Sequence, residues 1–550
     1  MDKRSLLAIV LSILILVVSQ ELISYFYPPP QQPHQPQQAA PPTTPQTLAP
    51  AQTPQPPIGQ SLQGSTTQES TLQPPSTDST MRDLTIENDV YTAVITTLGG
   101  RLKSVRLKYY PGDAGRNSPP REMIKEGFGG ELPLAFKLEG KGFTLSDEAV
   151  HYQTTSGNLQ VHGAEQATLE LKGKLSNGVA ISKTFVFSGQ TYGMTLMIKT
   201  EGASEAVSFA SLVWTQGAEP HLTSSYQHHG PVALVDRKFI YESATSLKKE
   251  EKDLGPGRIR WGGYADTYFL AAMIPPENET NHLLLSSAQG TTTAKLTIPW
   301  KREPITYTLY IGPKDFEALN AVDPSLDRAI DFGWFHFIAR PLVYVLRYSH
   351  SLTGNYGIDI IILTFLVKLA FFPLTNKSFQ SMAKMREVQP LLERLREQYK
   401  DDREKLNKEM MELYRRYKIN PLGGCLPMLV QMPVFIGLYQ ALSNAIELRQ
   451  APFFGWIQDL SQPDRLGSVN LIFIEPPGIP VLTLLMGATM LVQQAMTPAT
   501  GDPTQQKMMM LMPLIFTIMF VNFPSGLVLY WLVNNVLSIA QQYAYQKGLV

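Results

Sequence analysis

The sequence predicts a multi-domain membrane protein, with a six-span α-helical membrane domain, a large all-β domain and a helical hairpin outside the membrane. Three observations predict this fold class: long apolar runs in the second half of the chain, alternation of apolar and polar residues over about 81–313, and a charge-rich stretch with helical spacing between two apolar runs. The chain has 550 residues, and charged residues make up 17% of them, against about 25% in an average soluble domain. That length predicts two or more folding units.

Composition argues against several classes of function. Lysine plus arginine and aspartate plus glutamate number 47 each, which argues against a surface built for phosphates, so no direct nucleic-acid role is expected. The single cysteine, Cys425, excludes an internal disulfide and a cysteine-rich metal site, and we interpret it as a packing residue. The predicted spans hold no catalytic His/Glu or Ser/His pair, no metal-spaced cluster and no phosphate-binding glycine loop. We therefore expect no enzyme activity, no catalytic residue, no cofactor and no metal.

Residues 1–27 indicate either a signal peptide or a membrane anchor. Two basic residues precede the apolar run Leu6 to Val18, which suits a signal sequence, but the run resumes from Leu22 to Tyr27 and reaches nearly the length of a span. This favours a retained anchor, and under either alternative the chain after residue 27 is exported. Residues 28–80 consist almost only of Pro, Gln, Thr, Ser and Ala, a composition that predicts a disordered tether.

Residues 81–315 are predicted to form an all-β sandwich. Short stretches alternate apolar and polar residues with a period of two, and breaks such as Gly99-Gly100 and Gly262-Gly263 separate them. The clearest stretches are 92–96, 167–171, 183–187, 194–198 and 305–310.

Residues 316–352 are predicted to form an amphipathic helix at the membrane interface. Aromatic residues such as Trp334 and Phe337 are interspersed with charged residues and with Pro341. That mixture argues against a span and favours a helix lying on the membrane surface.

Apolar segments in residues 353–550 predict five spans, near 358–374, 426–446, 479–495, 508–523 and 527–545. With the anchor they make six. The segment 376–418 holds twelve Lys/Arg and eight Asp/Glu, whereas 447–478 holds only two basic residues, Arg449 and Arg465. The positive-inside rule therefore places the first segment in the cytoplasm and the second outside, with both chain termini in the cytoplasm.

The cytoplasmic segment 377–418 is predicted to be a helical hairpin. Apolar residues from Met382 to Tyr399 and again from Leu406 to Tyr417 follow helical spacing, and Asp401-Asp402 interrupts them. Pairs such as Glu404 with Lys408 support the second helix.

Lys368 is the main candidate for a functional residue, because it lies near the middle of the predicted span 358–374. It precedes Lys377, at the cytoplasmic end, by nine residues, or about 13 Å at helical rise. A charge at that depth costs roughly 2.5 kcal/mol or more, so it is expected to face water or protein. The alternative is that its side chain snorkels to the interface.

Other predicted spans carry polar residues that fit a shared wet cavity with Lys368. The alternative is that each is a hydrogen-bonding link between helices. These residues are Thr364, Gln431, Gln493, Gln494, Asn522, Asn534, Asn535 and Gln541. A methionine cluster at Met508, Met509, Met510 and Met512 offers a flexible apolar surface for varied substrates or partners, although helix packing accounts for it equally.

The motifs of the second half resemble those of the Gram-negative YidC membrane protein insertases. The match covers about Leu326 to Leu549, and its specificity lies in the combination of motifs. They are Phe332-Gly333-Trp334-Phe335, Thr364-Phe365-Leu366-Val367-Lys368, Ser381-Met382-Ala383-Lys384-Met385, Asn420-Pro421-Leu422-Gly423-Gly424-Cys425, Gln431-Met432-Pro433, Leu448-Arg449-Gln450-Ala451-Pro452-Phe453 and Phe523-Pro524-Ser525-Gly526-Leu527.

This resemblance implies a protein of the bacterial inner membrane that inserts nascent membrane proteins and helps them fold, alone or with the Sec translocon. It implies that the β domain is a periplasmic supersandwich similar to sugar mutarotases. It also implies that Lys368 lies in a groove open to the cytoplasm and to lipid, and that Thr364 and Trp531 occupy positions implicated in substrate contact.

Three departures from the family pattern qualify these implications. Lys368 stands where relatives usually have arginine, and Trp531 stands where they commonly have tyrosine. After the last predicted span only Lys547 to Val550 remain, so the ribosome is a possible partner but binding through a long basic tail is not expected.

The sequence therefore predicts an insertase whose substrate groove is lined by polar and aromatic residues. The predicted set is Lys368, Thr364, Gln431, Gln493, Asn522, Trp531 and Asn534. Two alternatives stay open: a secondary transporter that uses Lys368, which would normally show internal repeats, and a tethered periplasmic carbohydrate-binding or enzyme domain that uses His228 and His229.

Overall fold

A computed structural model gives the structure of the chain. It describes residues 81–112, 118–217, 229–248, 250–277, 280–400, 402–417, 426–470, 474, 476–496 and 503–549. The predicted anchor and tether over residues 1–80, the residues Cys425 and His228, and the motif Asn420 to Cys425 lie outside the described residues.

The first described part is the predicted all-β domain, which contains three sheets. The five-stranded sheet has the order β4 (Pro120–Glu122), β3 (Arg101–Pro111), β2 (Tyr91–Thr96), β1 (Asp83–Glu87), β7 (Leu159–Gln160). The eight-stranded sheet has the order β13 (Lys238–Tyr241), β12 (Gly230–Val235), β15 (Ile259–Ala265), β16 (Phe269–Ile274), β19 (Ile305–Pro313), β10 (Gly193–Glu201), β9 (Ala180–Ser188), β8 (Gln166–Lys174). The six-stranded sheet has the order β14 (Lys252–Asp253), β17 (His282–Ala288), β18 (Thr291–Pro299), β11 (Val207–Gly217), β5 (Ala135–Gly140), β6 (Phe143–Ser146).

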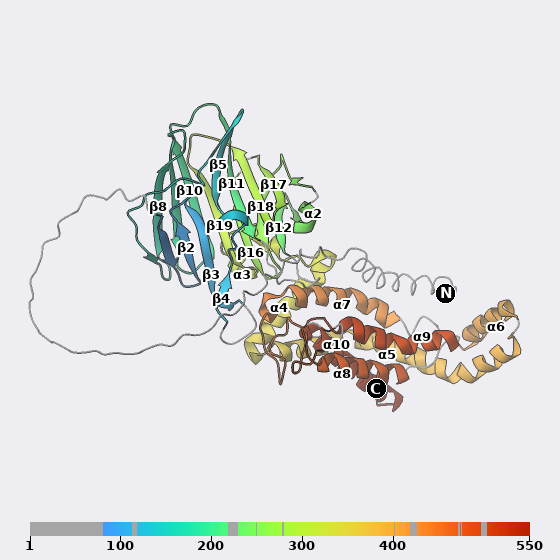
Figure 1. Ribbon diagram of the computed structural model, residues 1–550. Helices are drawn as coiled ribbons and strands as arrows, with labels where there is room; N and C mark the ends of the chain where they lie inside the picture. The colour runs from blue at the N-terminus through green and yellow to red at the C-terminus, as the bar shows by residue number, and fades with distance from the viewer. Residues whose placement is uncertain are drawn as a thin grey trace, which may run out of the picture. The chain divides into compact units, whose positions relative to one another are not determined.

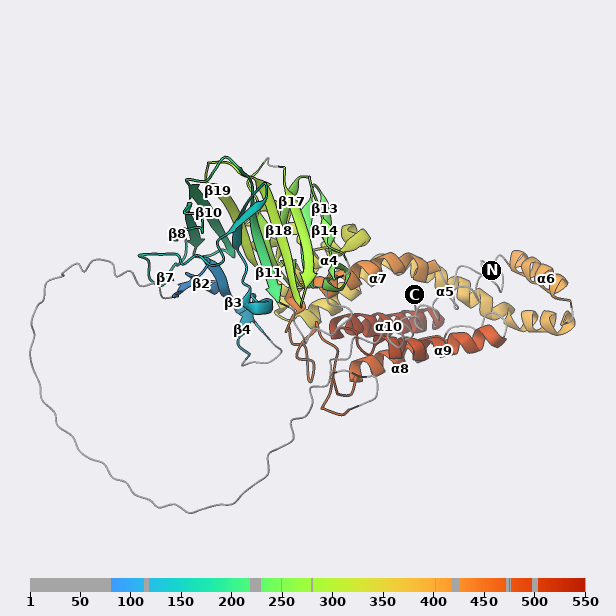
Figure 2. The same ribbon diagram turned by 45° about the horizontal axis from the view of Figure 1, so that its top comes forward.

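The two larger sheets pack over one apolar core (Figures 1 and 2). Alternation explains this packing: in β9, every second residue from Ile181 to Phe187 is buried and its neighbours are partly exposed. The strands of both sheets pair antiparallel, and Phe185, Trp214 and Trp261 are among the largest fully buried side chains. The predicted all-β class of this domain is confirmed.

An unexpected ion pair lies inside this core. Lys183 on β9 and Asp147 are both fully buried, with Nζ 2.6 Å from Oδ2. Lys183 also donates to the carbonyls of Gly99 and Leu134, and Asp147 accepts from Phe136 N. Burial lowers the pKa of the Lys183 ammonium, and the Asp147 carboxylate opposes that shift. A buried charge is tolerated only with such partners.

The second described part is helical. Its short elements are α3 (Phe316–Asn320), η2 (Pro324–Ala329), η3 (Gly333–Phe335) and η5 (Ile446–Leu448), whereas η1 (Phe128–Gly130) and α2 (Ala244–Leu247) lie within the β domain. The longer helices are α4 (His336–Thr353), α5 (Tyr356–Gln398), α6 (Arg403–Arg416), α7 (Leu426–Asn444), α8 (Val481–Met496), α9 (Pro503–Phe520) and α10 (Ser525–Gln546). α10 packs against α5 and α8, and α8 packs against α9 (Figure 1).

The structure differs from the sequence prediction at α5. The predicted span 358–374 and the first arm of the predicted hairpin are one helix of 43 residues, with Pro373 and Pro390 inside it. The charged residues after Leu374 continue the helix because Lys, Arg, Glu and Gln are good helix formers. α5 ends at Gln398 and α6 begins at Arg403, and Asp402 between them accepts from Lys405 N at the start of α6.

The structure divides the predicted interfacial region 316–352 into α3, η2, η3 and α4; α3 agrees with the short helix expected near Phe316, whereas the amphipathic helix expected from Leu326 begins only at His336. Pro324 begins η2, and Gly333 adopts a φ of +59° between Phe332 and α4. α4 buries Ala339, Val343 and Leu346 on one face. The other side exposes apolar residues, among them Phe337, Tyr344, Tyr348 and Leu352.

Within the described residues, one helix, α5, is both long and apolar enough to cross a membrane, and two shorter apolar helices lie at Val481–Met496 and Met509–Phe520. α9 begins at Pro503 rather than near 508 and ends at Phe520, before the predicted limit of 523. Six spans therefore stay a prediction.

We predict that Lys183→Met lowers the free energy of unfolding of the β domain by about 3–5 kcal/mol, because Asp147 stays buried without its partner. Combining Lys183→Met with Asp147→Leu should recover part of this loss. The measurement is chemical denaturation of the purified chain, monitored by the fluorescence of the buried Trp214 and Trp261.

Lys172→Met is the matched control, because Lys172 pairs with Glu170 on the same sheet but has a side chain that is 69% exposed. It should cost less than about 1 kcal/mol. Equal losses for Lys172→Met and Lys183→Met would contradict the structural importance of the buried pair.

Candidate functional site

Lys368 lies on α5, half-buried, and points to α10. Its Nζ donates to Ser538 Oγ at 2.6 Å, and Ser538 in turn donates to the backbone carbonyl of Asn534 at 2.7 Å. Within the described part of the chain Lys368 has no ion-pair partner. A hydroxyl oxygen therefore takes one of the three ammonium donors, and no anion neutralises the charge.

A third helix, α7, joins the contacts between α5 and α10 through Gln431. Gln431 Nε2 donates to Asn534 Oδ1 at 3.0 Å and approaches the Tyr530 hydroxyl at 3.5 Å. Three helices distant in sequence thus meet through Lys368, Ser538, Asn534 and Gln431, which we call the polar cluster. Gln431 and Asn534, which the sequence predicts to line the substrate groove, contact each other directly.

Thr364 and Trp531 lie beside the polar cluster in different roles. Thr364 is one turn before Lys368, is 1% exposed, and donates to the Ile360 carbonyl of its own helix at 2.6 Å. Trp531 packs its ring against Phe435 and Phe520, with centroids 4.6 and 4.8 Å apart. The hydroxyl of Thr364 is thus used within the helix, and Trp531 belongs to an aromatic group.

Gln493 and the methionines lie on the two helices beyond α10. Gln493 is half-buried on α8, where Asn535 of α10 donates to Thr489 at 3.3 Å. Met510 is 57% exposed on α9, and Met509 and Met512 are partly exposed. Met508 also belongs to α9. The role of these residues in binding a substrate stays a prediction.

Asn522 is not part of the polar cluster. It follows the end of α9, and its Oδ1 accepts from Arg465 Nη2 at 2.8 Å. Ser525, at the start of α10, precedes Ser538 by 13 residues, or about 20 Å of helix. That Asn522 lines the groove stays a prediction; in the structure its side chain binds Arg465.

Arg465 and Asp464 instead tie together one end of the helices. Arg465 also donates to the Val521 and Pro476 carbonyls at 3.0 and 2.7 Å. Asp464 is buried and accepts from Leu482 N and Thr483 Oγ1, at the first turn of α8. Two adjacent residues thus hold the start of α8 and the end of α9.

The polar cluster offers hydrogen-bond donors, acceptors and one positive charge, but not the groups that most enzyme chemistry needs. The described residues contain no group of three or more potential metal ligands. The arrangement suits attraction and solvation of a polar or acidic segment rather than bond making.

Sequence reasoning missed Ser538 and Arg465. Ser538 lies four residues after Asn534, so helical spacing placed both on one face of α10 and was the available signal. No signal in the sequence pointed to Arg465, because its partners are backbone carbonyls of residues distant in the chain.

Comparison with known proteins finds matches along most of the chain. The family described as "60Kd inner membrane protein" matches residues 348–550, and the family described as "YidC periplasmic domain" matches residues 83–345. A membrane protein insertase YidC of Syntrophus aciditrophicus is 40% identical over 560 residues, with 100% of both chains covered. That of Pelobacter propionicus is 39% identical, with 98% of both chains covered.

Two solved structures are more distant matches. An active YidC insertase crystal structure is 17% identical, with a TM-score of 0.36, and covers 84% of this chain and 92% of its own. A galactose mutarotase-like protein of Lactobacillus casei is 8% identical, with a TM-score of 0.27, and covers 42% of this chain and 100% of its own.

We predict that Arg465→Gln loosens the end of the helices that Arg465 ties together, since a glutamine cannot reach all of its carbonyl partners. Backbone amides from Val521 to Gly526 should exchange with solvent roughly tenfold faster. Hydrogen–deuterium exchange read by mass spectrometry measures this, with Arg302→Gln, which removes a largely exposed ion pair with Glu205, as the control. Unchanged exchange at Val521 to Gly526 would show that Arg465 is dispensable there.

Proposed function

The chain belongs to the YidC family of membrane protein insertases, and we propose that its polar cluster receives the hydrophilic part of a substrate protein during insertion. The observation that carries this proposal is the position of Lys368, an unneutralised cation between α5, α7 and α10. Such a charge is costly in an apolar bundle unless polar groups or water surround it. The polar cluster supplies those groups.

In the proposed mechanism, lipid accommodates the apolar segment of the substrate, and the polar cluster accommodates its polar part. The apolar segment of the substrate gains roughly 25 cal/mol for each Å² that it removes from water. Its polar terminus or loop loses hydration in the hydrocarbon, where unpaired polar groups each cost several kcal/mol. Hydrogen bonds from Lys368, Gln431 and Asn534 lower that barrier. An acidic terminus is also attracted by the charge of Lys368.

No covalent step or nucleotide is needed for this mechanism. We propose that the protein works without enzyme chemistry, because the apolar surface of the substrate supplies the driving free energy.

Exposed apolar side chains support contact with lipid on several helices. α5 exposes Phe365, Leu366 and Leu369 beside Lys368. α9 exposes Leu514 and Ile518. Such surfaces are unusual in a protein surrounded by water but ordinary in a bilayer. A substrate that leaves the polar cluster along α5 would therefore meet lipid directly.

The protein is an inner-membrane protein with a periplasmic domain. We propose residues 353–550 as the membrane domain, α6 and the end of α5 as a cytoplasmic hairpin, and both chain termini as cytoplasmic. The many basic residues between 376 and 418 support this orientation. The exposed Trp334 and Phe337 support a position for the start of α4 at the membrane interface.

The partners that fit this function are nascent membrane proteins and lipid. We further propose cooperation with the Sec translocon, and a ribosome contact through the basic hairpin rather than through a tail. The exposed methionine of α9, Met510, supports a soft apolar contact with substrates or partner proteins.

We predict that Lys368→Ala lowers insertion of a small single-span substrate with an acidic terminus about tenfold, because one charge in a low-dielectric site contributes on the order of 1.4 kcal/mol. A substrate with a neutral terminus should lose less than about twofold, since it gains no Coulomb attraction. Protease protection of the substrate in liposomes that contain each variant measures this.

Lys368→Arg is the matched control. Arginine keeps the charge, so this variant should retain most of the activity. Equal losses for acidic and neutral substrates in Lys368→Ala would contradict the electrostatic role.

A further inference from the structure

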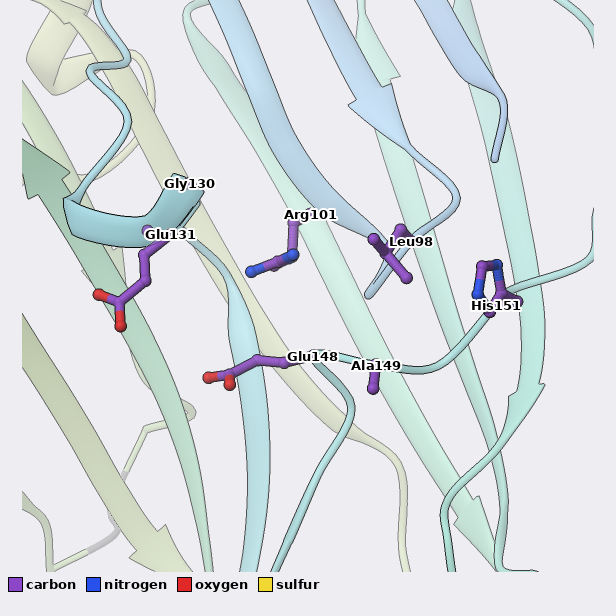
Figure 3. A pocket seen from close by; sticks show the side chains of 8 residues that line it. Leu98, Arg101, Gly130, Glu131, Glu148, Ala149 and His151 are labelled. Carbon is purple, nitrogen blue, oxygen red and sulfur yellow. The ribbon is translucent and has the colours of Figure 1, made fainter. Parts of the chain in front are cut away.

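The β domain contains an open cavity of about 420 Å³ into which side chains of opposite charge point. The charged ends of Arg101, Glu131 and Glu148 gather on one side of the cavity (Figure 3). The rest of the lining consists of Leu98, Gly129, Gly130, Ala149 and His151. Its volume falls in the range of small-molecule sites.

Arg101 is the unusual member of this lining. Its Nε is buried and donates to no acceptor, and the residue forms no ion pair within the described part of the chain although two carboxylates line the same cavity. Buried donors are almost always satisfied, so an unsatisfied one requires an explanation. Arg101 as a whole is only partly buried and lines the cavity, so an acceptor in the cavity can reach the outer part of its guanidinium.

The buried Lys183–Asp147 pair lies directly behind the cavity residues. Lys183 binds the carbonyls of Gly99 and Gly100, which precede Arg101 and have φ of +74° and +54°. Asp147 precedes Glu148. A Cβ on Gly100 would lie 3.1 Å from the Lys183 side chain, so the turn is closely packed on the ion pair. The pair therefore holds both the Arg101 and the Glu148 segments in fixed positions.

The charges around the cavity balance. Glu148 pairs with Lys137 at 3.1 Å, so Arg101 and Lys137 offset Glu131 and Glu148. An anion would be repelled by the two carboxylates, and a cation by the two basic groups. The fitting ligand is neutral and offers acceptors to Arg101 and donors to the glutamates. A hydroxyl group does both.

We propose that this cavity binds a neutral saccharide unit, with Arg101, Glu131 and Glu148 hydrogen-bonded to its hydroxyl groups. An extended polypeptide fits less well. Of the residues that line the cavity only Arg101 belongs to a named strand, β3, and the others come from a short 3-10 helix and loops, so the cavity does not present the edge of a strand to a peptide. The apolar lining is limited to side chains such as Leu98 and Ala149. No reaction on the saccharide is implied.

The test is a binding titration of the full chain in a polyoxyethylene detergent, whose head group contains no sugar. Methyl β-D-glucopyranoside, methyl β-D-galactopyranoside and N-acetyl-D-glucosamine are the probes, and saturation-transfer NMR reads binding. At least one probe should bind saturably. Arg101→Gln should weaken it roughly tenfold, because a charge-assisted hydrogen bond is lost.

Arg106→Gln is the matched control, because Arg106 lies on the same strand with a side chain that is 64% exposed and pairs with Glu122 instead. It should bind like the wild type. If Arg101→Gln unfolds, Glu131→Gln replaces it, since Glu131 is exposed, and it should weaken binding at least about threefold. The proposal is overturned if no probe binds saturably, if both cavity variants bind like the wild type, or if an uncharged peptide binds in an Arg101-dependent manner and the sugars do not.

Discussion

The solvation of one ammonium group constrains the arrangement of the helices. Lys368 lies among apolar helices, where a charge without polar neighbours is costly, so α5 requires hydroxyl and amide groups from other helices at that level. Ser538 and Asn534 provide them from α10, and Gln431 provides an amide from α7. The contacts that satisfy the lysine are therefore also the contacts that set the order of three helices.

The two ends of this bundle are built by different means. At one end, Asp464 and Arg465 bind backbone groups of α8 and of the residues after α9, so that loop and helix ends form one connected structure. At the other end side chains of one helix bind groups of another: Gln541 of α10 donates to Asn376 of α5, and Gln542 donates to the Met496 carbonyl at the end of α8. The first end is thus built from a loop and helix ends, and the second from contacts between helices.

Much of this organisation could be predicted from the sequence, and the failures have physical causes. Hydropathy and charge located Lys368, Gln431 and Asn534, because an ionisable or amide group in an apolar run is a strong signal. The end of α9 at Phe520, before Asn522, was missed because hydropathy does not show where a helix ends, although the nearby Pro524 did. The buried Lys183 was missed, yet alternation along β9 placed it on the same face as Ile181 and Phe185. A charge at an inward position is a signal for a partner, but the identity of that partner, Asp147, depends on the tertiary fold.

The unbroken course of α5 has a mechanical consequence. A helix of 43 residues is a rod of about 64 Å, and a rod transmits a push or a twist from one end to the other. Pro373 interrupts its hydrogen-bond ladder five residues beyond Lys368, which makes a compliant joint between the outer arm and the bundle. A joint that bends easily absorbs a sideways load, so a pull on α6 and the outer arm of α5 moves that arm about Pro373 and largely spares the turn that carries Lys368.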